Sequence, residues 1–279
     1  METLSTKRKW RLHDLKFSDR NEFQKPEKTI ALQVRVSIIT VCYNSASTIK
    51  DTLESVRGQD YKNIEHIIVD GNSGDGTMDI VRSYAHIDKW ISEKDMGLYD
   101  AMNKGLNMAT GDVIGILNSD DVYADNTVIS KVAACFANSE YETVYGDLAY
   151  VNHNNLQKVV RRWKSGIFKP SNFYFGWMPP HPTFFVLKEV YEKVGRFNLS
   201  LKSSADYEIM LRILFKYHFR AYYLPEVLVN MRAGGISNAS LINRIKANYE
   251  DRKAWKLNQL HPYFFTLFLK PIRKIFQFI

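Results

Sequence analysis

The amino-acid sequence predicts an α/β protein in which helices cover a mostly parallel sheet. Two observations lead to this prediction: short apolar runs alternate with amphipathic stretches from residue 36 onward, and polar clusters follow the runs. The chain has 279 residues, 45% of them hydrophobic, and a chain of this size buries a core without disulfide bonds. We expect one folded domain over residues 35–240, between a basic extension at 1–34 and a helical, amphipathic tail at 241–279.

The first half of this domain predicts strands and helices in alternation. Strands are expected at residues 36–41, 65–70, 89–93 and 112–117. Ser47 is expected to cap a helix in which Ile49, Leu53 and Val56 fall on one face. Two further helices are expected at residues 78–84 and 98–108. Because ligands bind at the carboxyl ends of the strands in open α/β sheets, the polar residues that follow these strands should meet at one edge.

After about residue 140 the pattern changes to short strands of mixed character. We expect strands at residues 143–145, 148–151, 159–163 and 183–187, and a helix at 206–217. An aromatic loop at residues 173–180 precedes the last of these strands. This half is therefore predicted to be a lobe that continues the first sheet and shapes the substrate site.

Composition and charge exclude several classes of protein. Cys42 and Cys135 are the only cysteines, which excludes a zinc cluster of thiolates and a disulfide-rich secreted protein. The formal net charge is +8, but the excess of Lys and Arg lies at the two ends of the chain, whereas a nucleic-acid binder usually carries a basic stripe on its folded body. The first thirty residues hold no apolar signal sequence, and no apolar run reaches the roughly 18 residues of a membrane-spanning helix. We therefore expect a cytoplasmic protein that binds no nucleic acid.

Two adjacent carboxylates, Asp120 and Asp121, follow the expected strand at 112–117. Hard oxygen ligands of this kind suit Mg²⁺ or Mn²⁺ held jointly with the phosphates of a substrate. The alternative is a turn in which Asn118, Ser119 and the two carboxylates cap the next helix. The residues by themselves leave both interpretations open.

Four further residues allow both a functional and a structural interpretation. Asp70, followed by Gly71, can accept hydrogen bonds from a nucleobase imide or a ribose hydroxyl, or can form a tight turn, and Asp95 is similar. Asp206 stands at a helix start, where it can act as a general base or simply complement the helix dipole. His181, between two prolines, is expected beside a pocket in a structural or acceptor-contact role, and a catalytic role stays open.

Six motifs, taken in chain order, resemble those of the family-2 inverting glycosyltransferases, in the branch that builds bacterial surface polysaccharides. They are VSIITVCYN (36–44), IIVDGNSGDGT (67–77), SEKDMGLYDAMNKG (92–105), GILNSDD (115–121), HPTFF (181–185) and ADYE (205–208). Each motif is weak alone, but the ordered set, which spans roughly residues 35–237, is specific. The resemblance implies the GT-A fold, a Rossmann-like, mostly parallel sheet flanked by helices, with an acceptor-side lobe continuous with it.

The resemblance also implies which residues bind the donor. By this analogy Tyr43, Asp70, Asp95, Ser119 and Asp120 bind a nucleotide sugar. Asp70 looks like the carboxylate that reads the nucleobase, and Asp95 assists it nearby. A nucleotide-sugar donor is therefore the expected partner of the site.

The same resemblance implies positions for the metal and for the catalytic base. The family's DXD motif holds a divalent metal on the diphosphate, and because Asn118 stands at its first position, Asp120 is the expected ligand of Mn²⁺ or Mg²⁺. Asp206 falls at the position of the family's catalytic base. Asp121 and His181 are weaker candidates for contacts with the acceptor or the pocket.

The implied activity is transfer of one hexosyl or N-acetylhexosaminyl unit, with inversion, from a nucleotide-diphosphate sugar that is expected to be UDP-linked. The acceptor is expected to be a glycan on a lipid carrier, in the synthesis of O-antigen, capsule or exopolysaccharide. Processive members of the family carry Gln-x-x-Arg-Trp after the base. Here the only Arg-Trp pair, Arg162-Trp163, precedes Asp206, so a non-processive enzyme is expected.

Two other classes of function fit parts of the sequence. A sugar nucleotidyltransferase also uses an α/β sheet and a metal on phosphates, but it needs a basic, Gly-rich loop after the first strand. Residues 43–47 have neither feature. In a non-catalytic module that binds sugars or nucleotides, the same carboxylates would be cap residues only.

The C-terminal residues 261–279 mix aromatic and aliphatic side chains with Lys270, Arg273 and Lys274. This composition suits an interfacial anchor against anionic lipid, and Pro271 interrupts any continuous helix through the segment. We expect peripheral contact with the inner face of the cell membrane. The alternative is a helix that packs on the domain itself.

Overall fold

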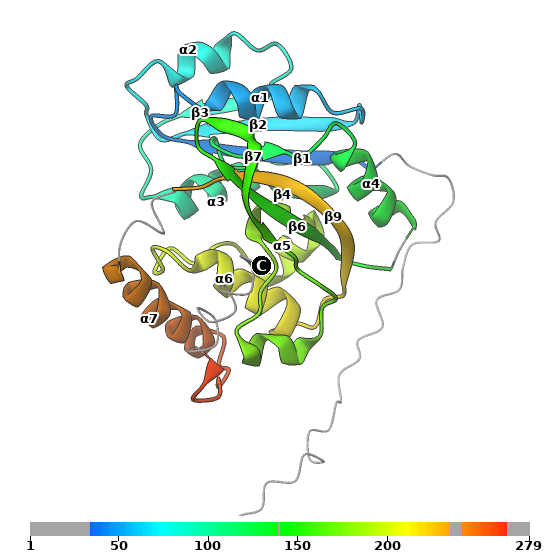
Figure 1. Ribbon diagram of the computed structural model, residues 1–279, viewed down its shortest axis with the longest axis vertical. Coiled ribbons are helices and arrows are strands. Elements are labelled where there is room, and N and C mark those ends of the chain that lie inside the picture. Colours follow the sequence, from blue (N-terminus) through cyan, green and yellow to red (C-terminus); the bar gives the residue numbers. More distant parts are fainter. Residues whose placement is uncertain (1–33, 139, 235–240, 267–279) are drawn as a thin grey trace, which may run out of the picture. The chain divides into compact units, whose positions relative to one another are not determined.

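The computed structural model describes residues 34–138, 140–234 and 241–266, except for the side chains of residues 138 and 241–247. Within these ranges nine strands form one sheet, and helices lie on both of its faces (Figure 1). The expected N-terminal extension lies outside the described residues apart from residue 34.

The first half of the domain alternates strands and helices as the sequence predicts. Its strands are β1 (Val36–Cys42), β2 (Ile64–Asp70), β3 (Lys89–Ser92) and β4 (Val113–Ile116). Its helices are α1 (Ile49–Arg57), α2 (Thr77–Arg82) and α3 (Leu98–Met108). The strands are parallel and lie in the order β3-β2-β1-β4, so their carboxyl ends share one edge.

Both faces of this parallel sheet are apolar because helices cover each of them. Ile39 and Val41 of β1 belong to the core cluster that contains the buried side of α3, whereas Cys42 belongs to the cluster of α1. The approach of α3 is close at Gly105, where a Cβ atom would lie 2.3 Å from Cγ2 of Ile39. Helix α3 therefore rests directly on β1, and a side chain at position 105 would displace one of them.

The second half continues the same sheet, as predicted. Its strands are β5 (Val122–Tyr123), β6 (Thr143–Asn152), β7 (Asn155–Trp163), β8 (Phe185–Leu187) and β9 (Ala221–Arg232). Its helices are α4 (Val128–Asn138), α5 (Lys188–Val194), α6 (Ala205–Met210) and α7 (Leu241–Leu257), with short 3₁₀ helices η1 (Pro170–Phe175) and η2 (His181–Thr183) and a π-helix η3 (Leu211–Lys216). β8 pairs antiparallel with β4, and β6 then joins β8 to β9.

One difference from the sequence prediction concerns β6 and β9. The strands expected at 143–145 and 148–151 form one strand, β6, which runs parallel to β9. The sequence does not predict β9, because Pro225 lies within it and proline is disfavoured inside a sheet. The structure accommodates Pro225 by a register shift at this point, between the pairs Tyr145↔Tyr223 and Asp147↔Val227.

Two other expected elements are interrupted. The strand expected at 183–187 begins as the 3₁₀ turn η2, in which Pro182 supplies no backbone donor for strand pairing. The helix expected at 206–217 is α-helical only to Met210 and continues as the π-helix η3. The first interruption begins at His181, and the second follows the short helix α6 that contains Asp206.

A buried polar cluster that the sequence did not single out lies at the amino ends of the parallel strands. Glu65 is fully buried and accepts hydrogen bonds from Ser37 Oγ (2.5 Å), Thr110 N–H (2.8 Å), Thr110 Oγ1 (2.7 Å) and Lys89 Nζ (2.8 Å). Burial alone would raise the pKa of Glu65, but these hydrogen bonds outweigh it and lower the pKa to about 2. The cluster ties β1, β2 and β3 to the connection between α3 and β4.

The described part of the C-terminal tail packs on the domain. Trp255 of α7 is fully buried, and its Nε1 donates to Tyr207 Oη over 2.8 Å. Asn258 Nδ2 donates to Glu208 Oε1 over 2.9 Å. Helix α7 of the tail thus packs on the domain, whereas most of the segment expected to contact a membrane, residues 267–279, lies outside the described residues. Among the helices of the described segments, none combines the length and the apolar character needed to cross a bilayer.

Candidate active site

The polar residues predicted at the carboxyl edge of the sheet do meet there. β1 runs into Tyr43, β2 ends at Asp70, and β4 leads into residues 118–121. The register pairs Cys42 with Asp70, and Asp70 with Ser92, so that the ends of β1, β2 and β3 lie side by side. The loops that follow these strands therefore share one surface.

Hydrogen bonds lock the loops after β1, β2 and β4 to one another. Asn44 has a left-handed backbone (φ 48°), which Asn tolerates better than most residues. Its N–H donates to Ser73 Oγ over 2.8 Å, and its Oδ1 accepts from the N–H of Gly74 over 3.0 Å. Ser45 Oγ lies 2.8 Å from Ser119 Oγ, a hydrogen bond that joins the β1 loop to the β4 loop. The edge is thus held as a rigid unit.

Asp70 is fully buried beneath this network. Its Oδ1 accepts from Ser73 Oγ over 2.5 Å and from Cys42 Sγ over 3.5 Å, and its Oδ2 accepts from Ser73 N–H over 3.0 Å and from Ser92 Oγ over 2.6 Å. Burial, followed by the charge of Asp70, raises the pKa of the Cys42 thiol, so that it stays a donor. Asp70 orders the loop after β2 in this arrangement, and its contact with a nucleobase stays a prediction.

Tyr43, Gly71 and Asp95 come together at the surface of the same edge. Tyr43 is 67% exposed. A Cβ atom at Gly71 would lie 3.0 Å from Asp95 Oδ2 and 3.3 Å from the Tyr43 ring, so position 71 presents bare backbone between them. Lys104 of α3 pairs with Asp95 Oδ1 over 2.5 Å, which leaves Oδ2 next to Gly71. An aromatic ring, bare backbone and a carboxylate oxygen are suited to bind a flat, hydrogen-bonding ligand.

Residues 118–121 form a turn, in which the N–H of Asp121 donates to the carbonyl of Asn118 over 3.1 Å. The interpretation of the two carboxylates as a helix cap is wrong, because β5 follows directly and α4 begins only at Val128. Asp121 is fully buried, and its Oδ2 accepts from Asn118 Nδ2 over 3.3 Å. Among the described residues, Oδ1 of Asp121 and Oδ1 of Asn118 are buried without a hydrogen-bond partner. Burial, followed by the charge of Asp120, raises the pKa of Asp121 well above its ordinary value.

Arg232, the last residue of β9, holds the backbone of this turn. The guanidinium is almost buried, at 5% exposure. Its Nη1 donates to the carbonyl of Asp120 over 2.6 Å and its Nε to the carbonyl of His153 over 3.1 Å, while Nη2 pairs with the carboxylate of Asp51 on α1. One side chain therefore connects the Asp120 turn, the hairpin of β6 and β7, and α1.

Asp206 lies in the first turn of α6, and its two oxygens have different neighbours. Tyr99 Oη donates to Oδ1 over 3.0 Å, and His181 Nδ1 lies 3.5 Å from Oδ2. His181 Nε2 in turn lies 3.5 Å from Asn118 Nδ2, which donates to Asp121. Burial lowers the pKa of His181 in spite of the nearby carboxylates of Asp206 and Asp120, so its ring is largely neutral at pH 7.

The structure thus divides the predicted site residues into two connected groups. His181 lies between Asp206 and Asn118, which belongs to the turn that contains Ser119, Asp120 and Asp121. Tyr43 and Asp95 surround Gly71, with Asp70 buried beside them.

Sequence reasoning missed Tyr99, Lys104 and Arg232. Tyr99 and Lys104 lie inside the motif at 92–105, but their partners are on other elements, which helical spacing does not reveal. Arg232 lies in the one long strand that the sequence did not predict, and no motif marks it.

The candidate site therefore lies at the carboxyl edge of a parallel α/β sheet, the edge at which such folds bind their ligands. The family model for glycosyl transferase family 2 matches residues 37–195. The chain belongs to glycosyltransferase family 2. A PGL/p-HBAD biosynthesis glycosyltransferase of Mycobacterium bovis is 29% identical to it over 208 residues, which cover 72% of this chain and 78% of the relative.

Two solved structures share the fold. Staphylococcus aureus TarS 1–349 in complex with UDP-GlcNAc aligns with a TM-score of 0.62 at 18% identity, over 80% of this chain and 65% of that chain. The mannosyltransferase PcManGT from Pyrobaculum calidifontis, in complex with GDP-Man and Mn²⁺, aligns with a TM-score of 0.60 at 20% identity, over 88% of this chain and 72% of that chain. The likeness confirms the GT-A fold that the sequence motifs implied.

Proposed function

We propose that the protein transfers one sugar, with inversion, from a nucleotide-diphosphate sugar to a hydroxyl group of a glycan acceptor. The observation that carries this proposal is the link between Asp206 and the Asp120 turn, which runs through His181 and Asn118 at one sheet edge. A one-step displacement needs a group that serves the leaving diphosphate and a carboxylate that takes the acceptor's proton. Membership of glycosyltransferase family 2 supports the same class of reaction.

The proposed donor is a UDP-linked hexose or N-acetylhexosamine. The two structural neighbours bind UDP-GlcNAc and GDP-Man. In this chain the exposed Tyr43 ring, the backbone at Gly71 and Oδ2 of Asp95 suit a uracil ring and its imide N–H. Asp70 supports this surface by ordering Ser73, and Ser119 connects it to the turn that would face the diphosphate.

Asp120 is the proposed ligand of Mn²⁺ or Mg²⁺, held jointly with the donor's diphosphate. The oxygens at the turn fit such an ion, because the buried Oδ1 atoms of Asn118 and Asp121 have no hydrogen-bond partner in the described segments. No three His, Cys, Asp or Glu side chains of the described chain form a metal-binding group, so phosphate and water oxygens would complete the coordination. When bound, the ion supplies neutralisation of the charge that develops on the leaving diphosphate.

Asp206 is the proposed general base. Its carboxylate accepts the proton of the acceptor hydroxyl as that oxygen attacks the anomeric carbon, while the bond from that carbon to the diphosphate breaks. Tyr99 donates to Oδ1 over 3.0 Å, whereas His181 Nδ1 lies 3.5 Å from Oδ2, so Oδ2, which has the longer contact, is the oxygen that the acceptor would meet. A single displacement inverts the anomeric centre, and an α-linked donor gives a β-linked product.

The decisive experiment incubates the protein with a panel of sugar nucleotides and Mn²⁺ and measures release of the nucleoside diphosphate. We expect release with one UDP-sugar and an acceptor extended by a single sugar, detected by mass spectrometry. Pyrophosphate formation from a nucleoside triphosphate and a sugar 1-phosphate would support a nucleotidyltransferase instead. Donor binding without turnover on any acceptor would support a binding module.

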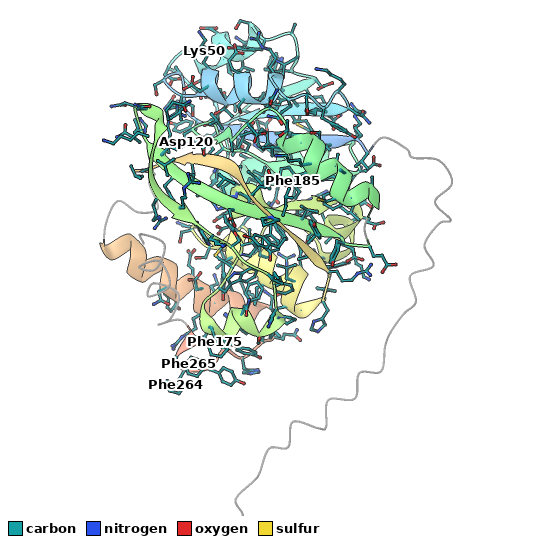
Figure 2. The ribbon with its side chains drawn as sticks, turned by 45° about the vertical axis from the view of Figure 1, so that its right-hand side comes forward. Lys50, Asp120, Phe175, Phe185, Phe264 and Phe265 are labelled. Carbon is teal, nitrogen blue, oxygen red and sulfur yellow. The ribbon has the colours of Figure 1, made fainter. Side chains whose placement is uncertain are left out.

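The proposed acceptor is a lipid-carrier-linked glycan in the synthesis of O-antigen, capsule or exopolysaccharide, reached from the inner face of the cell membrane. Aromatic side chains near the C-terminus support contact with a membrane: Phe265 lies with its ring 6.0 Å from Phe175 and 5.3 Å from Phe264 (Figure 2). Phe264 is 84% exposed and Phe175 49%. The sequence that follows carries Lys270, Arg273 and Lys274, and aromatic and basic residues together favour the surface of anionic lipid.

Co-sedimentation with anionic vesicles tests this contact. Removal of residues 261–279 should release the protein from the vesicles, and high salt should weaken binding of the full chain. Phe264→Ala should weaken binding. Tyr249→Ala should not, since Tyr249 is an exposed aromatic residue of α7 (73%) outside the group formed by Phe175, Phe264 and Phe265. Equal sedimentation of the truncated and full-length chains would remove the membrane from the proposal.

A further inference from the structure

Tyr99 makes a contact with the proposed base that no sequence motif explains. It is the second residue of α3, it is 7% exposed, and its hydroxyl donates to Oδ1 of Asp206 over 3.0 Å across 107 positions of the chain. Burial, followed by the charge of Asp206, raises the pKa of Tyr99. The phenol therefore keeps its proton at physiological pH and remains a hydrogen-bond donor.

The Tyr99 ring is held independently of Asp206. It stacks on Phe197 with centroids 5.7 Å apart and an interplanar angle of 20°. Asn103, one turn further along α3, fixes the backbone of Phe197 at both ends: its Nδ2 donates to the Phe197 carbonyl (2.9 Å), and its Oδ1 accepts the Phe197 N–H (3.0 Å). The ring is thus oriented by α3 and the segment before α6, and its hydroxyl lies at the start of α6, near the backbone of Ala205 and Asp206 and the carboxylate of Asp206.

Helix α3 contacts both groups of site residues. Lys104 pairs with Asp95 in the proposed nucleobase group, and Tyr99 bonds Asp206 in the acceptor-side group. The helix rests on β1 without a gap, because Gly105 brings it against Ile39. The distance between the donor surface and the base is therefore set by one rigid helix.

We propose that Tyr99 is a positioning residue that orients the carboxylate of Asp206 through Oδ1, so that Oδ2, beside His181, is presented to the acceptor hydroxyl. The proposal rests on the proposed function of Asp206 as the base. A hydrogen bond donated to the ionised carboxylate favours that form over the protonated one. A fixed carboxylate also avoids the loss of rate that accompanies a misplaced catalytic group.

The test compares Tyr99→Phe with Tyr223→Phe in steady-state kinetics over a range of pH. Phe keeps the ring that packs on Phe197 and removes only the hydroxyl. We expect kcat to fall by about 10- to 100-fold, with the donor KM unchanged, and the acidic limb of the kcat profile to move to higher pH by about one unit. Tyr223→Phe removes a matched contact, Tyr223 Oη to Asp147 Oδ1 at 2.8 Å. It should change neither kcat nor the acidic limb of the kcat profile.

A double-mutant cycle with Asp206→Asn separates this inference from the assignment of the base. If Tyr99 acts through Asp206, Tyr99→Phe lowers kcat in the wild-type chain but adds no further loss to Asp206→Asn. Independent losses that multiply would overturn the proposal. An active Asp206→Asn enzyme would remove the base itself, whereas an inactive Asp206→Asn beside an unimpaired Tyr99→Phe would remove only the role of Tyr99.

A second substitution keeps the test valid if Tyr99→Phe folds poorly. Incorporation of 3-fluorotyrosine at position 99 retains the shape of the ring and makes the phenol a stronger donor. The acidic limb should then move to lower pH, the direction opposite to that of Tyr99→Phe. A change in melting temperature without any movement of the limb would show a structural role only and would contradict the proposal.

Discussion

The two ends of the parallel sheet each bury a carboxylate, but they treat it differently. At the amino ends, Glu65 receives hydrogen bonds from Ser37, Thr110 and Lys89, and its pKa is lowered to about 2. At the carboxyl ends, Oδ2 of Asp121 accepts from Asn118, its Oδ1 is buried without a hydrogen-bond partner among the described residues, and burial raises its pKa.

The difference in hydrogen bonding distinguishes the two buried carboxylates. A buried carboxylate whose oxygens are all bonded within the protein stabilises the fold, because the hydrogen bonds replace its lost hydration. A buried oxygen without a partner costs stability, and it is retained where a ligand or ion supplies the missing contact. Within the described residues, Glu65 and, at the opposite edge, Asp70 thus have hydrogen bonds to both oxygens, whereas Oδ1 of Asp121 has none.

The largest expected effect is that of Asp120→Ala at the carboxyl end. Divalent-dependent transfer should be abolished, since the proposed ligand to the metal is lost, while the protein stays folded. Activity with added Mn²⁺ and after EDTA treatment measures this, with Asp79→Ala, an exposed carboxylate of α2, as the control. Full activity of Asp120→Ala, or wild-type activity that is insensitive to EDTA, contradicts the assignment of the metal.

The next effect is that of Asp206→Asn. The amide keeps the size of the side chain but cannot take up the acceptor's proton, so kcat should fall by roughly 10²- to 10⁴-fold. Donor affinity, measured by calorimetric titration of the UDP-sugar, should stay near that of the wild type. Lost donor affinity with preserved turnover would make Asp206 a binding residue and not the base.

A smaller effect is expected at Arg232, which supports the carboxyl end from behind. Arg232→Ala removes the donor to the Asp120 carbonyl and should lower kcat/KM by about tenfold, because a buried hydrogen bond from a charged group is lost. Arg232→Lys should retain part of the kcat/KM that Arg232→Ala loses. Arg220→Ala at the other end of β9, which breaks an exposed pair with Glu142, is the matched control. Titration of each variant with Mn²⁺ and UDP reports whether the lower kcat/KM comes from weaker binding.

The smallest effect on catalysis is expected at the amino end, where Glu65→Gln should leave kcat unchanged and lower stability by roughly 2 kcal/mol at pH 7. The folded pKa of about 2 lies below the unfolded value of about 4.3, so the contribution of Glu65 is present above about pH 5 and is lost as the pH falls toward 2. Denaturation of the wild type and of Glu65→Gln at pH 7 and pH 3 measures this difference in stability. A stability difference that does not shrink at pH 3 would contradict the role of the Glu65 charge.

Much of the parallel half was predictable from the sequence because its signals are local. The apolar run of β1 and the spacing of Ile49, Leu53 and Val56 in α1 report which faces are buried, whatever lies against them. The position of Asp120 after β4 places it at the ligand edge by the topology of parallel sheets alone. These predictions needed no knowledge of distant residues.

The second half was less predictable because its structure depends on contacts between distant segments. Pro225 argues locally against a strand, yet β9 forms because β6 on one side and β5 on the other pair with it around a register shift. The helix expected after Asp206 changes to the π-helix η3, and its periodicity gave no sign of that change.

The sequence by itself determined the fold class, the edge of the sheet where ligands bind and the carboxylates available there, because periodicity and strand order depend on neighbouring residues. Only the tertiary structure decided what each carboxylate does: Asp70 is enclosed by Ser73 and Ser92, Asp121 is buried beside Asn118, and Asp206 is bonded by Tyr99. The partners in such contacts come from different elements, and the burial and hydrogen bonds that they impose on each carboxylate cannot be predicted from neighbouring residues in the sequence.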